Sequence, residues 1–173
     1  VVDLGPDTTV CATFLLDAQN SGSSYLWNTS ESTQAITVTT TGDYWVVVTD
    51  TNSCVGTDTV SVTINPLPIV VLSGLDTICA GDNTLLTGSS GGTSQWYFNG
   101  VAISGATSST YLASQAGVYN MIKTNANGCA DSSAVGIELV VNNLPVVTLT
   151  GNDTICSGDS TLLTGSSGGT SQW

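Results

Sequence analysis

Five cysteines carry the most evident chemistry in this sequence. They occur as Cys11 and Cys54, then Cys79 and Cys129, then Cys156. There is no histidine and no CxxC motif, so disulfide bonds are favoured over a zinc site. We expect the bonds Cys11–Cys54 and Cys79–Cys129, with Cys156 bonded to a cysteine beyond residue 173. Disulfides indicate an oxidising, extracellular compartment, and the alternative is reduced thiols in a cytosolic protein.

Catalytic groups are scarce. Lys123 is the only basic residue, and the many Ser and Thr hydroxyls have no histidine to activate them. We therefore expect no enzymatic activity and no cofactor. The net charge of −12 repels phosphate backbones, which argues against a nucleic-acid partner. No stretch approaches the roughly 20 apolar residues that a membrane span needs.

Carboxylates could hold calcium if several of their oxygens converge. Asp3 with Asp7, or Asp50 with Asp58, could supply part of such a site. The alternative is that each Asp only stabilises a turn, and we favour that interpretation.

The glycine-rich segment 88–92, repeated at 165–169, superficially resembles a loop that binds phosphate. It lacks the lysine of such loops and lies between two predicted strands. We therefore predict a turn between strands B and C of a β-sandwich.

The sequence contains an internal repeat, and the residues described above belong to its units. Residues 155–173 restate residues 78–96 with two changes at an offset of 77, and residues 146–173 match residues 69–96 at 22 of 28 positions. A period of this size is typical of a tandem array. We predict a first domain at 1–65, a second at 66–142 and the N-terminal part of a third, truncated domain at 143–173.

Within each unit, short apolar runs alternate with turn residues, and no stretch has the period of a helix. Asn99-Gly100 between two such runs predicts a two-residue hairpin. The predicted strands cover residues 10–16, 25–27, 35–39, 42–50 and 59–64, then 69–72, 84–87, 95–99, 101–103, 110–113, 117–124 and 135–141. The chain is therefore predicted to be all-β, with tandem immunoglobulin-like β-sandwich domains.

The order Cys, Trp, Tyr, Cys supports this fold. Large aromatic side chains are expected to fill the domain cores: Trp27, Trp96, Trp173, Tyr44 and Tyr119. The two tyrosines resemble the tyrosine corner of immunoglobulin domains, but they precede the second cysteine by ten residues rather than two. We therefore expect each disulfide to connect the start of strand B with the F–G turn at one pole of the domain.

Residues 4–54 and 96–129 resemble the Ig-like and PKD-like repeats of giant secreted surface proteins of Bacteroidota, often gliding-associated adhesins exported by the type IX system. The resemblance implies an extracellular, multi-domain and non-enzymatic protein. Asp-Thr pairs at equivalent places resemble the O-glycosylation motif of that phylum, which implies glycans at Thr8, Thr77, Thr154 and also Thr59. The alternative is a turn-forming Asp followed by a strand-forming Thr.

The favoured function is a structural repeat segment of an extracellular fibre, filament or adhesin stalk. Short proline-containing linkers, Asn65-Pro66-Leu67-Pro68 and Asn142-Asn143-Leu144-Pro145, favour semi-rigid spacing of the domains. Further copies of the repeat, in the same chain or in neighbouring chains of a filament, are the expected partners. The alternative is a glycan-binding module of a surface adhesin, which would use the exposed aromatic Trp45.

Overall fold

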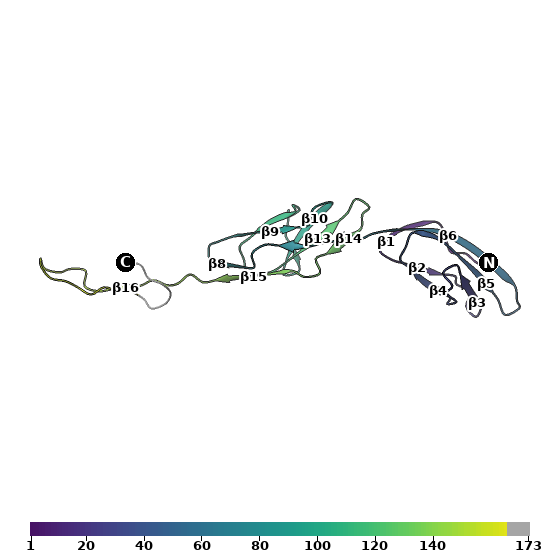
Figure 1. Cartoon of the computed structure of the whole chain (residues 1–173), viewed down its shortest axis with the longest axis horizontal. Coiled ribbons are helices and arrows are strands. Elements are labelled where there is room, and N and C mark those ends of the chain that lie inside the picture. Colours follow the sequence, from purple (N-terminus) through teal and green to yellow (C-terminus); the bar gives the residue numbers. More distant parts are fainter. Residues whose placement is uncertain (166–173) are drawn as a thin grey trace.

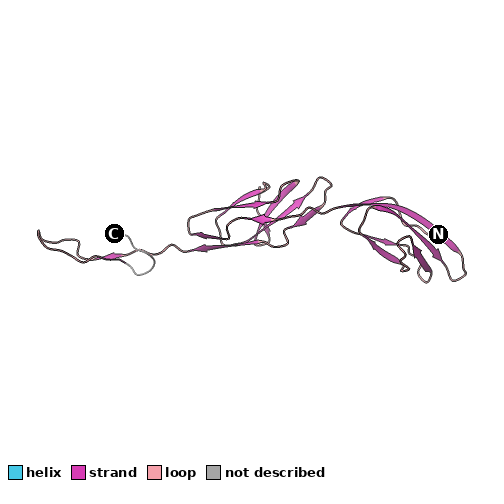
Figure 2. Ribbon diagram, in the orientation of Figure 1, coloured by secondary structure: helices cyan, strands magenta, loops and turns pink. Residues whose placement is uncertain are grey.

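The chain forms β-sandwich units that follow one another along one long axis (Figures 1 and 2). The structure, a computed structural model, describes residues 1–165. Every regular element in these residues is a strand. Trp173, one of the expected core residues, lies outside the described part, as do all but the first residue of the repeated glycine-rich segment 165–169.

The first unit packs a four-stranded sheet against a two-stranded one. The larger sheet has the order β1-β6-β5-β3, and the smaller sheet pairs β2 with β4. The strands are β1 (Thr8–Cys11), β2 (Phe14–Asp17), β3 (Ser24–Trp27), β4 (Ala35–Val38), β5 (Gly42–Thr49) and β6 (Val55–Asn65). Alternate residues of these strands face inward, as expected for a sandwich with one buried face on each sheet.

The segment 10–16, predicted as one strand, is in fact two strands in different sheets. Ala12 has φ +62° and separates β1 from β2. A left-handed residue breaks the extended path, so the chain crosses from one sheet to the other. Cys11 is thereby the last residue of β1 and does not lie within the longer strand predicted from the sequence.

The second unit repeats the sandwich with more strands. Its larger sheet has the order β11-β10-β13-β15-β8, with β14 beside β13, and its smaller sheet has the order β12-β9-β7. The strands are β7 (Leu72–Ser73), β8 (Thr77–Cys79), β9 (Thr84–Gly88), β10 (Thr93–Phe98), β11 (Val101–Ala102), β12 (Thr110–Ala113), β13 (Gly117–Thr124), β14 (Ala130–Ser132) and β15 (Ile137–Asn142). The predicted hairpin forms, because Phe98 pairs with Val101 and both Asn99 and Gly100 have positive φ.

Each unit has its own core around a buried tryptophan. Trp27 and Trp96 are 1% and 0% exposed. The indole nitrogen of Trp27 donates to the carbonyl of Thr33 at 2.9 Å, and that of Trp96 donates to the carbonyl of Ser108 at 3.0 Å. Because each buried N–H has a partner, the large ring is buried without leaving a polar group unsatisfied.

A buried tyrosine in each unit fixes the loop before its own strand, β5 in the first unit and β13 in the second. The hydroxyl of Tyr44 donates to the carbonyl of Thr40 at 2.8 Å, and the hydroxyl of Tyr119 donates to the carbonyl of Gln115 at 3.0 Å. Both bonds run back four residues, which is the arrangement of a tyrosine corner. Together with the two-sheet packing, these corners define the units as immunoglobulin-like.

Residues 143–165 repeat the start of the second unit. The short strands β16 (Leu149–Thr150) and β17 (Thr164–Gly165) pair Leu149 with Gly165. In the second unit β7 pairs Leu72 with Gly88 in the same register. The 22 identical positions of the repeat thus produce the same local pairing.

Candidate inter-unit junction

Cys11 lies at the pole of the first unit from which the chain leaves. Strand β1 runs parallel to β6, and Cys11 is in register with Asn65, the last residue of β6. The amide of Ala12 donates to the carbonyl of Asn65 at 3.0 Å. Because the linker starts directly after Asn65, the thiol of Cys11 is placed beside the linker to the second unit.

Cys129 belongs to the turn between β13 and β14, the F–G turn of the second unit. Asn125 shapes this turn, since its side-chain oxygen accepts hydrogen bonds from the amides of Asn127 and Cys129, both at 3.0 Å. The carbonyl of Cys129 in turn accepts a bond from the amide of Asn125 at 2.9 Å. This local pattern is an Asx turn that holds the cysteine at the tip of the unit.

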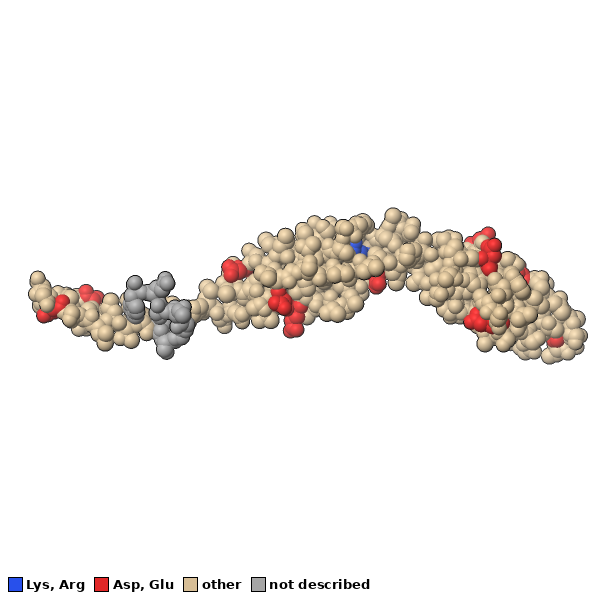
Figure 3. Space-filling model, in the orientation of Figure 1, with Lys and Arg blue, Asp and Glu red and all other residues tan. Residues whose placement is uncertain are grey.

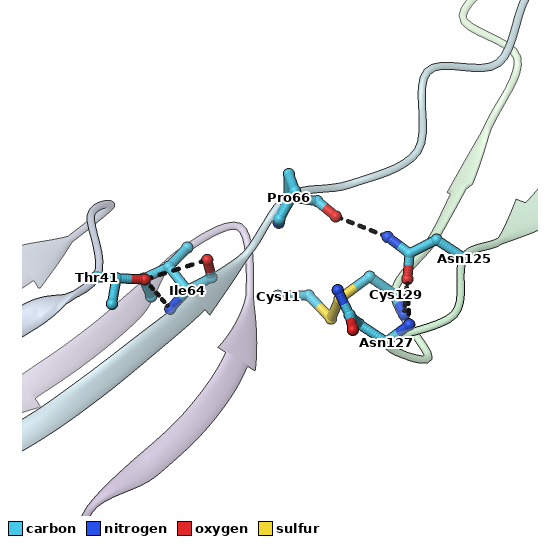
Figure 4. The surroundings of a disulfide bond; sticks show 7 residues. All are labelled: Cys11, Thr41, Ile64, Pro66, Asn125, Asn127 and Cys129. Carbon is cyan, nitrogen blue, oxygen red and sulfur yellow. Dashed lines mark hydrogen bonds between the residues drawn. A yellow bond between two sulfur atoms is a disulfide. The ribbon is translucent and has the colours of Figure 1, made fainter.

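A disulfide joins these two cysteines across the junction (Figure 4). Their Cα atoms are 5.6 Å apart, which is within the range that a disulfide spans. The side-chain amide of Asn125 also donates to the carbonyl of Pro66 in the linker at 2.8 Å (Figure 4). One covalent bond and one hydrogen bond therefore fix the second unit against the end of the first.

This pairing corrects the one expected from the sequence. Cys11–Cys54 and Cys79–Cys129 do not form; Cys11 is bonded to Cys129, and Cys54, Cys79 and Cys156 are free and exposed. The reason is the parallel pairing of β1 with β6. Cys54 immediately precedes β6, whereas Cys11 lies beside its last residue, so the 11 residues of β6 separate the two thiols by roughly 35 Å.

The same geometry separates the cysteines of the second unit. Cys79 is in register with Asn142, the last residue of β15, whereas Cys129 lies in the F–G turn at the other pole. Our expectation that a disulfide connects strand B to the F–G turn at one pole was therefore wrong, because these positions lie at opposite poles. No local sequence pattern signals this, because the parallel pairing of each first cysteine's strand with the last strand of its unit is a property of the fold.

Lys123 is buried in the second unit, where its ammonium group donates hydrogen bonds to two serines. It is 2% exposed, and its Nζ donates to the carbonyl of Ser89 at 2.6 Å and to the hydroxyl of Ser94 at 3.1 Å. Ser89 belongs to the glycine-rich segment 88–92, which connects β9 to β10 as the predicted B–C turn. A Cβ at Gly92 would lie 2.1 Å from the carbonyl oxygen of Thr124, so this close approach requires glycine.

Acidic side chains are spread over both units on the visible face (Figure 3). The four candidate calcium ligands each accept backbone hydrogen bonds: Asp3 from Gly5, Asp7 from Ser61, Asp50 from Asn52 and Cys54, and Asp58 from Leu4. Within residues 1–165, no three His, Cys, Asp or Glu side chains are grouped closely enough to hold a metal ion. The observed contacts of these carboxylates are therefore those of turn-forming and bridging residues.

The candidate glycosylation sites lie on or beside strands near the surface. Thr59, Thr77 and Thr154 are exposed, and Thr8 is half-buried. The hydroxyl of Thr77 donates to the carboxylate of Asp76 at 3.1 Å, and that of Thr154 donates to Asp153 at 3.2 Å. The Asp-Thr pairs thus repeat a local contact from one unit to the next.

Trp45 lies on the outer face of the larger sheet in the first unit. It is 41% exposed, and Leu26, on the neighbouring strand β3, is 53% exposed on the same face. At the equivalent place in the second unit, Asn120 accepts a bond from the hydroxyl of Ser133 at 3.3 Å. The aromatic ring is therefore not required by the fold at this position.

No family model matches the chain, and no curated protein matches its sequence. Among solved structures, it is similar to murine CEACAM1b, with 17% identity over 77% of this chain and 95% of that one and a TM-score of 0.38. The N-terminal Ig1-2 module of the Drosophila receptor protein tyrosine phosphatase DLAR has 12% identity over 79% of this chain and 95% of that one, with a TM-score of 0.34. A Ca²⁺-stabilised, ice-binding adhesin of an Antarctic bacterium has 14% identity over 83% of this chain and 49% of that one, with a TM-score of 0.36.

The described part of the chain contains no helix that is long and apolar enough to cross a membrane.

Proposed function

We propose that this chain is a structural repeat segment of an extracellular fibre, filament or adhesin stalk, in which immunoglobulin-like units act as spacers and carry no enzymatic activity. The observation that carries the proposal is the Cys11–Cys129 bond, which joins two consecutive units end to end. A covalent bond at this place limits bending between units. This property is useful in a stalk and has no evident use in a catalytic domain.

Three further observations support this function. The disulfide is suited to an oxidising compartment outside the cytosol. The linker between Asn65 and Leu72 is short and contains two prolines, which favours a restricted angle. The resemblance of residues 4–54 and 96–129 to repeats of secreted Bacteroidota surface proteins agrees with the same role. Further copies of the repeat, in the same chain or in a neighbouring chain, are the proposed partners.

Immunogold electron microscopy of the source cells would test this function. Antibodies raised against the chain should label intact, unpermeabilised cells along thin filaments, with a beaded pattern at the spacing of single domains. Cells that lack the coding sequence provide the control. Labelling that appears only after permeabilisation, or that marks compact particles instead of filaments, would contradict the proposal.

A second candidate function is glycan binding by the outer face of the first unit. The observation that favours it is the partial exposure of the large ring of Trp45, where the second unit has Asn120. Aromatic rings stack on the apolar faces of sugars, so loss of the ring should abolish binding. Glycan-array binding by the chain should be lost in Trp45→Ala and kept in Leu26→Ala, with both melting temperatures close to that of the parent. Equal binding by Trp45→Ala and the parent would refute this candidate.

A further inference from the structure

The exposed thiols of Cys54 and Cys79 lie where the bonded cysteines lie in the neighbouring unit. We propose that Cys79 forms a second inter-unit disulfide, whose partner is the F–G-turn cysteine of a third repeat unit folded from residue 143 onward. The proposal goes beyond the spacer function, because it assigns a covalent partner to Cys79 and does not depend on where the protein is located. It implies that each unit of the array is joined to the next by a disulfide bond.

Cys79 has the same backbone neighbours as Cys11. Cys11 is in register with Asn65, and Cys79 is in register with Asn142. In each case the amide of the next residue donates to the carbonyl of that asparagine, Ala12 to Asn65 at 3.0 Å and Ala80 to Asn142 at 2.8 Å. Each cysteine therefore ends a strand beside the point where the chain leaves its unit.

The F–G turns of the two units are also built alike. Asp50 accepts bonds from the amides of Asn52 and Cys54, both at 2.8 Å, just as Asn125 does from Asn127 and Cys129. The carbonyl of Cys54 accepts a bond from the amide of Asp50 at 3.0 Å. The cysteine is thus held at the same place on the turn in both units, so this position is a constant feature of the described repeats.

The distance between consecutive units is repeated as well. Leu72 follows Asn65 by seven positions, and Leu149 follows Asn142 by seven positions. Leu72 and Leu149 then start the same strand pairing, β7 with β9 and β16 with β17. A third unit would thus begin at the same spacing from Asn142, which lies beside Cys79, as the second unit does from Asn65, which lies beside Cys11.

One difference between the two turns decides where the proposal is strongest. The side-chain amide of Asn125 donates to the linker carbonyl of Pro66, whereas Asp50 has no N–H group with which to make such a bond. Cys54 therefore lacks one of the two contacts of the observed junction. Beside Cys79, residue 143 provides a backbone carbonyl at the position of Pro66, so a partner turn that carries an asparagine can make both contacts, and we place the proposal on Cys79.

The bond requires an oxidant. Two thiols, one on Cys79 and one on the partner turn, lose two protons and two electrons as the sulfur–sulfur bond forms. A small disulfide such as oxidised glutathione accepts them. The thiolate of one cysteine attacks it and releases one small thiol, and the second cysteine then displaces the other small thiol from the mixed disulfide. One disulfide is consumed and one is formed.

The two bonds would span overlapping stretches of the chain. The observed bond closes the stretch from Cys11 to Cys129, and the proposed bond starts at Cys79, within that stretch. Cleavage of the backbone anywhere between residues 11 and 129, or later up to the third F–G turn, would then leave the pieces covalently connected. The array would resist separation by a single proteolytic cut.

The test extends the present chain so that the third unit is complete. Trp173 is followed by a copy of residues 97–142, and that copy carries Ala130→Val as a mass label next to its cysteine. After refolding with oxidised and reduced glutathione and blocking of free thiols, peptides are mapped without reduction. We expect the Cys79 peptide to be joined to the labelled peptide, the Cys11–Cys129 bond to be retained, and Cys54 and Cys156 to be blocked as free thiols.

A bond between Cys156 and the labelled cysteine, or a free thiol at Cys79, would overturn the proposal. The matched control is Cys79→Ser in the extended chain, which should leave the labelled cysteine free. A second extended chain, in which residues 1–142 are followed by a labelled copy of residues 66–142, keeps the test decisive if the first chain does not fold its third unit. Its third unit is the whole second unit of this structure, and free Cys79 in that chain would also refute the proposal.

Discussion

Cys11 and Cys129 are separated by 118 positions in the sequence, yet their Cα atoms are 5.6 Å apart. The loop that their bond closes contains β2 to β13, and therefore most of both sandwich units and the whole linker. The bond thus acts on two domains at once: it constrains the unfolded chain of both, and it fixes the pole of one against the tip of the other.

The double variant Cys11→Ser with Cys129→Ser should be less stable than the parent. In the chain-entropy model a closed loop of about 100 residues contributes about 4.7 kcal/mol, and we expect a loss of about that size in the summed free energy of unfolding. Denaturant titration followed by tryptophan fluorescence measures it. Cys54→Ser, which removes a free exposed thiol, is the control and should unfold as the parent does. Unchanged stability of the double variant would contradict the structural bond.

Force applied to the ends of the chain should bypass most of both units. Because the bond connects Cys11 directly to Cys129, tension passes through the sulfur atoms and leaves residues 12–128 unloaded. Single-molecule pulling from the two termini should therefore release little chain length under oxidising conditions. Addition of a reductant should release roughly 400 Å more, since 118 residues extend by about 3.3–3.6 Å each. The same contour length with and without reductant would show that no such bond is present.

The hydrogen bond from Asn125 to the linker can be removed without loss of the turn. Asn125→Asp keeps the side-chain oxygen that accepts bonds from Asn127 and Cys129 but loses the N–H group that donates to Pro66. A net loss of about 1 kcal/mol should weaken formation of the Cys11–Cys129 bond about five-fold. Equilibration with glutathione and quantification of the bonded fraction measure this constant.

Asn127→Asp is the matched control for that variant. It introduces the same negative charge two residues further along the turn and leaves the contact with Pro66 in place. The control should form the disulfide as readily as the parent. If both variants weaken the bond equally, the effect is due to charge and not to the hydrogen bond.

Much of the fold was predictable because local patterns determine it. Residues 117–124 were predicted as a strand and form β13 with the same bounds, since inward and outward residues alternate there without interruption. The turn at Asn99-Gly100 was predictable because few residue pairs tolerate two successive positive φ angles. Residues 69–71, in contrast, were predicted as a strand but lie outside β7, although their apolar character is typical of strands.

The junction was not predictable from local patterns. Which pole a cysteine occupies depends on whether its strand pairs in parallel or antiparallel fashion with a strand about 50 residues away, and the sequence of β1 does not contain that information. The break at Ala12 was not visible in the sequence either, since the apolar run continues from Val10 to Leu16. The sequence favours a bond between the two cysteines of one unit, but the parallel pairing of β1 places Cys11 and Cys54 at opposite ends of β6.

The tyrosine corner of the second unit should give the chain a pH-dependent component of stability. Burial raises the pKa of the Tyr119 hydroxyl above its ordinary value of 10.0, despite the opposing effect of its bond to the carbonyl of Gln115. The folded unit therefore retains the proton more strongly than the unfolded chain. This contribution is fully present below about pH 10 and is lost as the pH rises through the raised value.

Tyr119→Phe should separate the contribution of the hydroxyl's hydrogen bond from the effect of its ionisation on stability. At neutral pH the variant loses the bond to Gln115, and the free energy of unfolding should fall by about 1 kcal/mol. Above about pH 10 the parent loses its ionisation-dependent stability and the variant does not, so the difference between them should narrow. Denaturant titrations at neutral pH and at several values above pH 10 measure this. Gln115→Ala keeps the backbone carbonyl that accepts the bond, so its free energy of unfolding should follow that of the parent at every pH. If the free energies of unfolding of the parent and of Tyr119→Phe fall in parallel above pH 10, the pH dependence does not come from Tyr119.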